Sequence, residues 1–161
     1  MEPKSVFPPI FSPGFHNINI EDLEEIFVKP FVNKDHRTKM LERFQVWLAE
    51  FYKVGIDAEI WIDGSFATFK ESPQDIDIAF FYNVTDLKKI SLDQRIIFNM
   101  ITSQDVKIRY YCDLNIIGNS FLDERFRWRG TFGFSWDDSP KGIARIYYVT
   151  NKETKSEYTR T

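Results

Sequence analysis

The clearest hydrophobic periodicity in the chain lies between residues 35 and 53. Apolar side chains recur there at spacings of three and four residues, as on one face of an α-helix. These positions are Met40, Leu41, Phe44, Trp47, Leu48 and Phe51. Gly55 follows where a residue in the left-handed conformation commonly ends a helix. We therefore predict a long amphipathic helix over residues 35–53 whose aromatic stripe packs into the core.

The segment before this helix has a different pattern. Residues 1–18 contain four of the seven prolines, which exclude a regular helix or a central strand. We expect this segment to be an extended arm whose aromatic side chains dock on the body of the protein. Residues 20–27 predict a short helix, with Asn19 as its N-cap and acidic residues in its first turn, that ends before Pro30.

After Gly55 the chain changes to short apolar runs that are typical of strands. We predict strands over residues 58–62, 75–82, 106–117 and 143–150. A helix is expected over residues 85–102, and residues 121–128 fit either a helical turn or a loop. Five side chains of the predicted helix are expected to face inward: Leu87, Ile90, Ile96, Ile97 and Met100.

Together these elements predict an α+β domain with one sheet flanked by helices. The 161 residues are enough for one core, so we expect a single domain over residues 1–150 and a polar, flexible tail over 151–161. The formal charge of -3 gives no general attraction to nucleic acid. The single cysteine, Cys112, excludes an intramolecular disulfide. The sequence shows neither a signal-peptide pattern nor a long apolar segment, which predicts a cytoplasmic protein without membrane contact.

The candidate chemistry is concentrated in residues 61–78. Asp75 and Asp77 are two residues apart in a predicted strand, so their side chains point to the same side while Ile76 and Ile78 enter the core. Two neighbouring carboxylates of this kind can bind a divalent cation such as Mg²⁺ or Mn²⁺. Asp-x-Asp pairs also occur at strand ends where they only face water.

Three further features strengthen the metal interpretation. Asp113 lies in the apolar context Tyr111–Leu114 and is expected to be a third carboxylate, which completes a metal site and helps to deprotonate a hydroxyl. Gly64 lets the backbone approach a phosphate closely, and Ser65 is expected to open a helix with free N–H groups. Lys70 is a candidate to neutralise triphosphate charge; the alternative is a solvated lysine.

Several other residues have both a structural and a functional interpretation. Asp63 is expected to cap the turn at Gly64. Lys141 lies in a Pro-Lys-Gly turn and is a candidate phosphate contact. The alternation of Arg125, Arg127 and Arg129 with Phe126 and Trp128 predicts either a strand with one buried face or a surface that stacks bases and binds RNA.

The spacing of Gly64-Ser65, Asp75-Ile76-Asp77 and Asp113 resembles the signature of the DNA polymerase beta-like nucleotidyltransferase superfamily. Residues 7–149 resemble more closely a family of small bacterial and phage-borne proteins assigned to that superfamily, through Phe7-Pro8-Pro9, Pro13-Gly14-Phe15-His16, Trp61 to Phe66 and Pro140 to Ile143. The resemblance implies a nucleotidyltransferase-like mixed sheet with helices mainly on one face. Its implied ligands are Mg²⁺ and a nucleoside triphosphate.

The resemblance also implies an activity: transfer of a nucleotidyl group to a hydroxyl of RNA or protein. Relatives of this size occur in toxin-antitoxin and phage-defence systems. In this chain Phe66 to Lys70 replaces the Arg and Gly that minimal members carry after Gly-Ser, and no helical domain follows the core. A second hypothesis is therefore a catalytically silent relative that binds nucleotide or a partner protein as a regulatory or antitoxin component. A third is an RNA-binding module that uses Arg125 to Arg129.

Overall fold

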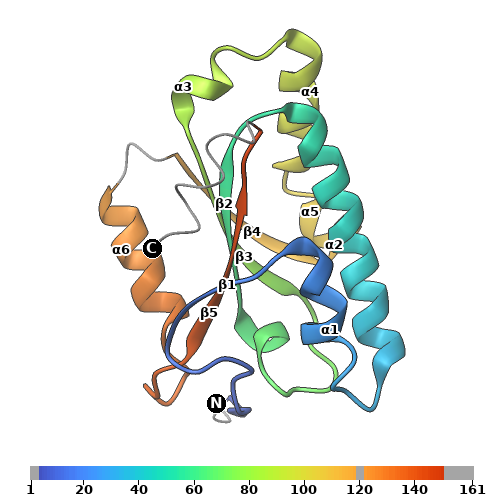
Figure 1. The fold of residues 1–161 in the computed structure, drawn as a ribbon, viewed down its shortest axis with the longest axis vertical. Coiled ribbons are helices and arrows are strands. Elements are labelled where there is room, and N and C mark those ends of the chain that lie inside the picture. Colours follow the sequence, from blue (N-terminus) through green and yellow to red (C-terminus); the bar gives the residue numbers. More distant parts are fainter. Residues whose placement is uncertain (1–3, 119–121, 151–161) are drawn as a thin grey trace.

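In the computed structural model, residues 4–118 and 122–150 are described, and they form a five-stranded mixed sheet (Figure 1). The strand order is β1-β5-β2-β3-β4. β2 is antiparallel to both β3 and β5, whereas β3–β4 and β1–β5 are parallel pairs. The strands are β1 Gly14–Asn17, β2 Ala58–Asp63, β3 Ile76–Tyr82, β4 Cys112–Gly118 and β5 Gly142–Tyr148.

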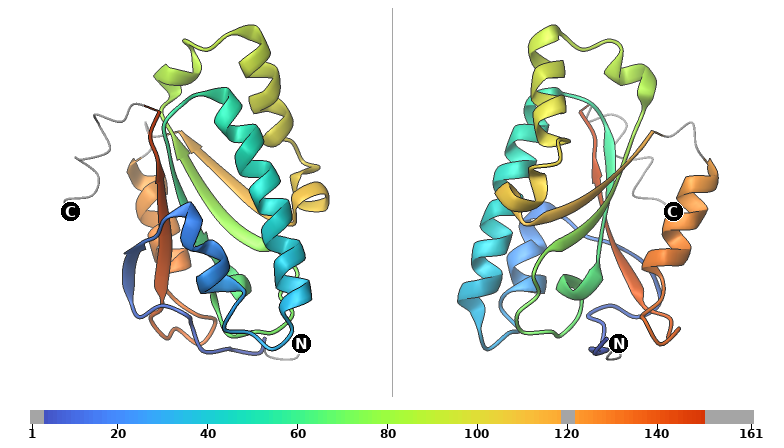
Figure 2. Two further views of the ribbon diagram at one scale, coloured as in Figure 1. Left: turned by 45° about the vertical axis from the view of Figure 1, so that its right-hand side comes forward. Right: turned by 180° about the vertical axis from the view of Figure 1, so that it is seen from behind.

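Helices cover the sheet unequally (Figure 2). One face is covered by α1, α2, α4 and α5, while α6 lies against the other face and α3 lies beyond one end of the sheet. Their bounds are α1 Leu23–Phe27, α2 Lys34–Val54, α3 Val84–Leu87, α4 Leu92–Ile101, α5 Val106–Tyr110 and α6 Leu122–Phe132. The α+β prediction is confirmed. None of the helices in the described ranges has the length and apolar character needed to cross a membrane.

The larger core lies between the sheet and α2. The predicted aromatic stripe of this helix is fully buried, and Gly55 ends the helix in the left-handed conformation, with φ of 70°. The rings of Trp47 and Phe51 meet Phe80 of β3 edge-on, with centroids 5.6 and 5.0 Å apart. A smaller core under α6 contains Trp61, Ala79, Phe81, Ile117, Phe132 and Ile143. The two cores lie on opposite faces of the sheet, because neighbouring residues of a strand point to opposite faces and residues two apart point to the same face.

The proline-rich segment at the N-terminus runs along the sheet. Its residues 14–17 form β1, an edge strand paired with β5, and Pro9 bridges to Thr68. The Phe15 ring packs on Trp61 at 4.8 Å between centroids. The tail over residues 151–161 lies outside the described residues.

The prediction of one strand over residues 106–117 is wrong in its first half. Val106–Tyr110 is the helix α5, and Tyr111 turns the chain with φ of 56° before β4 begins at Cys112. Val106 and Tyr110 are buried and four residues apart, as on one helix face, whereas Ile108 between them is 83% exposed. Burial of this pair in the core beside α2 outweighs the strand preference of the β-branched side chains.

The prediction of one helix over residues 85–102 is also wrong. The chain forms α3 and α4, with a new start at Ser91, whose side chain accepts a hydrogen bond from the Gln94 N–H in a capping box. Because α4 starts anew at Ser91, its buried face differs from that of one continuous helix. Phe98 and Ile101 enter the core, whereas Ile96 and Met100 are exposed. Leu87, Ile90 and Ile97 pack against the core as predicted.

A buried arginine ties the chain that follows Gly64 to α1 and α2. The Arg37 guanidinium of α2 donates to four carbonyl oxygens, those of Phe27, Phe66, Thr68 and Lys70, at 2.7–3.0 Å. It also lies over the Phe31 ring, 3.4 Å from the centroid. Burial lowers the pKa of Arg37 to about 10, so it remains charged at neutral pH. One cation thus joins α1, α2 and the segment that follows the turn.

Arg37→Met is expected to lower the free energy of unfolding by roughly 2–4 kcal/mol, because it leaves buried carbonyl oxygens without donors. Urea denaturation measures this change. Arg43→Met, at an exposed position of the same helix, is the matched control and is expected to change stability by no more than about 0.5 kcal/mol. Equal effects of the two substitutions would contradict a structural role for the Arg37 hydrogen bonds.

Candidate functional site

Three carboxylates lie in a row across neighbouring strands at one end of the sheet. Asp63 of β2 is the register partner of Asp77 in β3, and Asp77 is the register partner of Asp113 in β4. Register partners point to the same face of a sheet. That face is the one under α6, because Trp61 and Ala79, two residues along from Asp63 and Asp77, belong to the core there. The structure therefore brings Asp113 beside Asp77, on the same side of the sheet.

Asp75 extends this row beyond the strand. It precedes Asp77 by two residues, and its carboxylate Oδ2 lies 2.8 Å from the Lys107 ammonium Nζ. The same ammonium is 2.9 Å from Asp113 Oδ2. The two carboxylates raise the pKa of Lys107 above its ordinary value. One lysine of α5 thus links two of the three acids that the sequence proposes as metal ligands.

Gly64 closes the row at the end of β2. Its φ of 71° is the left-handed conformation that glycine adopts without strain. A Cβ at this position would collide with the Asp77 carboxylate, so the backbone of the turn lies directly against that side chain. Ser65 lies in the short 3-10 helix Gly64–Ala67, which begins at Gly64 and not at Ser65 as expected. The close approach of Gly64 to Asp77 requires glycine there.

Asp63 and Lys141 form a buried ion pair in the same site. Lys141 Nζ lies 3.0 Å from Asp63 Oδ2, and the two side chains are 9% and 2% exposed. The other carboxylate oxygen, Asp63 Oδ1, is buried without a hydrogen-bond partner. Burial raises the pKa of Asp63 to about 7 although Lys141 acts in the opposite direction. The expectation that Asp63 caps the turn is wrong, since its side chain makes no capping hydrogen bond.

The charges around Asp77 do not balance. Burial is the main cause that raises its pKa to about 6, and repulsion from Asp75 and Asp113 adds to it, whereas Lys107 and Lys141 lower it. Four carboxylates share this end of the sheet with two ammonium groups. An additional positive charge near Asp77 would therefore be stabilised, because it would relieve carboxylate repulsion.

The remaining phosphate candidate lies elsewhere. Lys70 Nζ lies 5.7 Å from the centroid of the Phe7 ring. Among the described residues, no ion pair joins Lys70 to an acid. Its backbone carbonyl is fixed by Arg37 at 2.7 Å. A contact of Lys70 with phosphate stays a prediction.

Of the alternatives for this segment, the helical one is confirmed, since Leu122–Phe132 is the helix α6, and the strand interpretation of the Arg125 to Arg129 alternation is wrong. Arg125 donates two hydrogen bonds to Glu59, at 2.8 and 2.7 Å, and Arg127 pairs with Glu124. The Arg129 guanidinium lies over the Phe15 ring at 5.6 Å. Because Arg125 is held by Glu59, it is not available for phosphate. RNA binding by this helix stays a prediction.

Sequence reasoning missed two parts of this site. Lys107 was not chosen as a site residue because residues 106–110 have the composition of a strand. The one indication of a helix is the pair Val106 and Tyr110, which are four residues apart and both buried. The Asp63–Lys141 pair joins residues far apart in the chain, through the pairing of β2 with β5. The one local indication of this pair in the sequence is that the acid Asp63 directly follows the apolar run Ile60-Trp61-Ile62.

No group of three or more His, Cys, Asp or Glu side chains within residues 4–118 and 122–150 is placed closely enough to hold a metal ion. In this arrangement Lys107 pairs with both Asp75 and Asp113. The donor set itself consists of carboxylate oxygens, the ligands preferred by Mg²⁺ and Mn²⁺. The surplus negative charge at Asp77 fits a divalent cation as well.

Comparison with known proteins gives one match. A family model described as "Family of unknown function (DUF6932)" matches residues 6–147. Neither curated proteins nor solved structures give a match to the chain.

Asp77→Asn is expected to raise the melting temperature of the metal-free protein at pH 8 and to change it little at pH 4. A carboxyl group whose pKa is raised in the folded state binds more protons there than in the unfolded state. The stability therefore falls as the pH rises from about 4 to about 6, and the substitution removes this loss. Circular dichroism melts at both pH values measure the effect.

The control for this experiment is Glu42→Gln, which removes an exposed carboxylate of α2 and is expected to show no such pH dependence. A melting temperature of the Asp77→Asn protein that is lower than that of the wild type at pH 8 would contradict the electrostatic strain at Asp77.

Proposed function

The chain belongs to the DUF6932 family, and we propose that it is a Mg²⁺-dependent nucleotidyltransferase that moves a nucleotidyl group from a nucleoside triphosphate to a hydroxyl of RNA or protein. The observation that carries the proposal is the position of Asp77, with Asp113 beside it in register and the Gly64 backbone against its carboxylate. Asp75 completes the three-acid pattern that resembles the nucleotidyltransferase signature. A biological role in a toxin-antitoxin or phage-defence system is part of the same proposal.

The architecture supports the nucleotidyltransferase-like interpretation of the fold. The sheet is mixed, with most helices on the face opposite the acids. The acids therefore lie on the face of the sheet that α6 covers, and their end of the sheet is also reached by Lys107 of α5 and by Lys141, which directly precedes β5. The carboxylate of Asp113 is 45% exposed, as a group that meets an acceptor hydroxyl requires.

Asp75, Asp77 and Asp113 are the residues that would hold the cation. When bound, Mg²⁺ supplies positive charge that offsets the carboxylates and the phosphate oxygens, and it stabilises the charge that develops on the leaving pyrophosphate. Without such charge, the acids at this end of the sheet would repel a triphosphate. The Gly64 backbone lines the position where phosphate and Asp77 meet.

The transfer itself needs a proton acceptor and two changes of bonding. The acceptor hydroxyl oxygen forms a bond to the α-phosphorus, and the bond from that phosphorus to the pyrophosphate oxygen breaks. Asp113 accepts the proton of the hydroxyl. Lys141, held in the buried pair with Asp63, places a fixed positive charge beside the phosphates.

Lys107 has a defined part in this proposal. Its ammonium pairs with Asp75 and Asp113 when no divalent cation is present. Asp75 and Asp113 could hold a cation only if the Lys107 ammonium moves away from them, and its positive charge would remain available beside a bound triphosphate. Because the Lys107 side chain is more than half exposed, its displacement costs little, on the order of the 0.2–1 kcal/mol of a surface ion pair for each contact.

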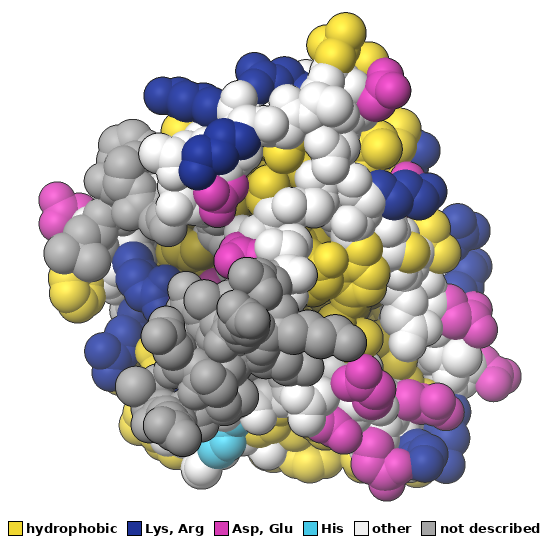
Figure 3. Space-filling model, turned by 45° about the horizontal axis from the view of Figure 1, so that its top comes forward, with side chains coloured by type: hydrophobic (Ala, Val, Ile, Leu, Met, Phe, Trp, Pro, Cys, Tyr) yellow, Lys and Arg dark blue, Asp and Glu magenta, His cyan; other side chains and the backbone are white. Residues whose placement is uncertain are grey.

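A second candidate function has one observation in its favour. Hydrophobic side chains reach the surface at the end of the molecule where α3 and α4 lie (Figure 3). Leu92 and Ile96 of α4 are exposed, and so is Ile108 of α5. Such a surface suits a catalytically silent protein that binds a partner protein as a regulatory or antitoxin component.

The activity is tested with labelled nucleoside triphosphates, Mg²⁺ or Mn²⁺, and cellular RNA or protein as acceptor. The wild type is expected to yield a labelled acceptor, and Asp75→Asn, Asp77→Asn and Asp113→Asn are each expected to reduce labelling at least a hundredfold because each removes a proposed cation ligand. Glu42→Gln is the control and is expected to label like the wild type. Labelling by the Asp77→Asn protein at the wild-type rate would refute the enzymatic proposal.

Lys107→Gln is expected to bind Mn²⁺ roughly three- to tenfold more tightly than the wild type, because two surface ion pairs no longer compete with the cation. Electron paramagnetic resonance of free Mn²⁺ measures the affinity without any activity assay. Lys89→Gln, which alters an exposed lysine paired with Asp86, is the matched control. Unchanged Mn²⁺ affinity in the Lys107→Gln protein would show that the cation does not bind between Asp75 and Asp113.

A further inference from the structure

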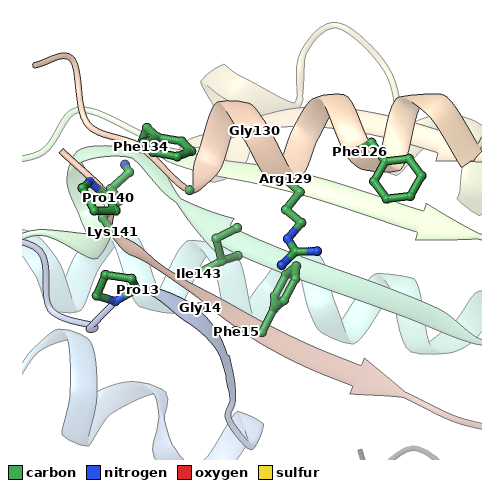
Figure 4. A pocket seen from close by; sticks show the side chains of 11 residues that line it. Pro13, Gly14, Phe15, Phe126, Arg129, Gly130, Phe134, Pro140, Lys141 and Ile143 are labelled. Carbon is green, nitrogen blue, oxygen red and sulfur yellow. The ribbon is translucent and has the colours of Figure 1, made fainter. Parts of the chain in front are cut away.

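A cavity of about 390 Å³ lies between α6 and the edge of the sheet formed by β1 and β5 (Figure 4). It opens on the same face of the sheet as the row of acids. The lining residues that matter here are Phe15, Phe126, Arg129, Gly130, Phe134 and Lys141. Its volume lies within the range of about 300–1,000 Å³ that is typical of small-molecule sites.

Gly130 of α6 is one of the residues that line this cavity. A Cβ at Gly130 would meet no heavy atom within 4 Å, so open space lies beside this position. A side chain larger than hydrogen can therefore extend from the helix at this wall of the cavity.

The walls of the cavity combine flat apolar surfaces with positive charge. Phe126 and Phe134 are exposed, and Phe15 lies beneath the Arg129 guanidinium, which is 5.6 Å from its centroid (Figure 4). Arg129 has no ion pair with an acid among the described residues, unlike Arg125 and Arg127 of the same helix. Aromatic rings and an arginine plane are the groups on which nucleic-acid bases stack.

The cavity and the acid site have one residue in common. Lys141 lines the cavity, and its ammonium pairs with Asp63 at 3.0 Å. Asp63 is in turn the register partner of Asp77. A ligand that contacts Lys141 from the cavity therefore lies one side chain away from the row of acids, where the proposed function places the phosphates.

We propose that this cavity holds the base of the donor nucleoside triphosphate, stacked against Arg129 and the neighbouring phenylalanine rings, with Lys141 between the base and the phosphates. The inference rests on the proposed function, because it needs the triphosphate to bind at the acids. The base is held by α6 and the N-terminal strand of the same domain.

Gly130→Leu tests this assignment because Gly130 lines the cavity and a Cβ there meets no heavy atom within 4 Å, so the leucine side chain takes up space that a base would need. Calorimetry in Mg²⁺ compares the four common nucleoside triphosphates with inorganic tripolyphosphate, which has the charge and no base. The substitution is expected to weaken the best-bound nucleoside triphosphate at least tenfold and to leave tripolyphosphate affinity within twofold. Gly130→Ala, the matched control, leaves most of the cavity open and is expected to keep both affinities within twofold.

A second variant removes the stacking group without filling the space. Arg129→Gln is expected to weaken the binding of nucleoside triphosphate at least about fivefold more than that of tripolyphosphate, because the base loses one of its stacking partners. Melting temperatures of all variants show whether the fold is kept. If Gly130→Leu fails to fold, the Arg129→Gln comparison still decides the matter.

The possible failures are distinct. Nucleoside triphosphate that binds equally well to the wild type, Gly130→Leu and Arg129→Gln proteins overturns the cavity assignment and leaves the proposed function standing. Tripolyphosphate affinity that falls as much as nucleotide affinity in both variants also overturns it, because the base then adds nothing. If neither ligand binds the wild type in Mg²⁺, the proposed function fails and this inference fails with it.

Discussion

Four carboxylates and two lysines share one end of the sheet, and the electrostatic balance among them governs the chemistry that this protein can perform. Asp77 lies at the centre, with Asp63 and Asp113 as register partners and Asp75 two residues before it. Lys107 and Lys141 compensate part of the charge from opposite sides. Burial is the main cause that raises the pKa of Asp63 and Asp77, and at Asp77 repulsion from Asp75 and Asp113 adds to it. A divalent cation would complete the compensation and would give a polyphosphate a place to bind.

The rest of the fold keeps this group of charges in place. The antiparallel pairing of β2 with β3 and the parallel pairing of β3 with β4 bring the three acids into one row. The Gly64 turn fits against Asp77 because Gly64 has no side chain. Arg37 holds the backbone that follows Gly64 through three hydrogen bonds and holds α1 through a fourth, to Phe27. The aromatic core between α2 and the sheet supports these strands from the opposite face. A rigid scaffold of this kind limits how far the acids can move apart to reduce their repulsion.

Local patterns in the sequence were sufficient to predict the elements whose buried residues follow one simple pattern along the chain. The long helix α2 and the strands β2 and β3 were predictable because their apolar positions repeat at helix or strand spacing, and Asp75, Asp77 and Asp113 could be chosen as candidates by spacing alone. Lys107 could not, because α5 is a five-residue helix with strand-like composition that only tertiary packing stabilises. The Asp63–Lys141 pair and the cavity beside Gly130 depend on contacts between distant segments, which leave no periodic signal.

The central claim is that this end of the sheet receives a divalent cation together with a triphosphate. A crystal structure with Mn²⁺ and a non-hydrolysable nucleoside triphosphate analogue tests it most directly. The account predicts anomalous density for Mn²⁺ between Asp75, Asp77 and Asp113, with the Lys107 ammonium moved away from Asp75 and Asp113. Lys107 still paired with both acids, with no Mn²⁺ density beside Asp77, would contradict the account.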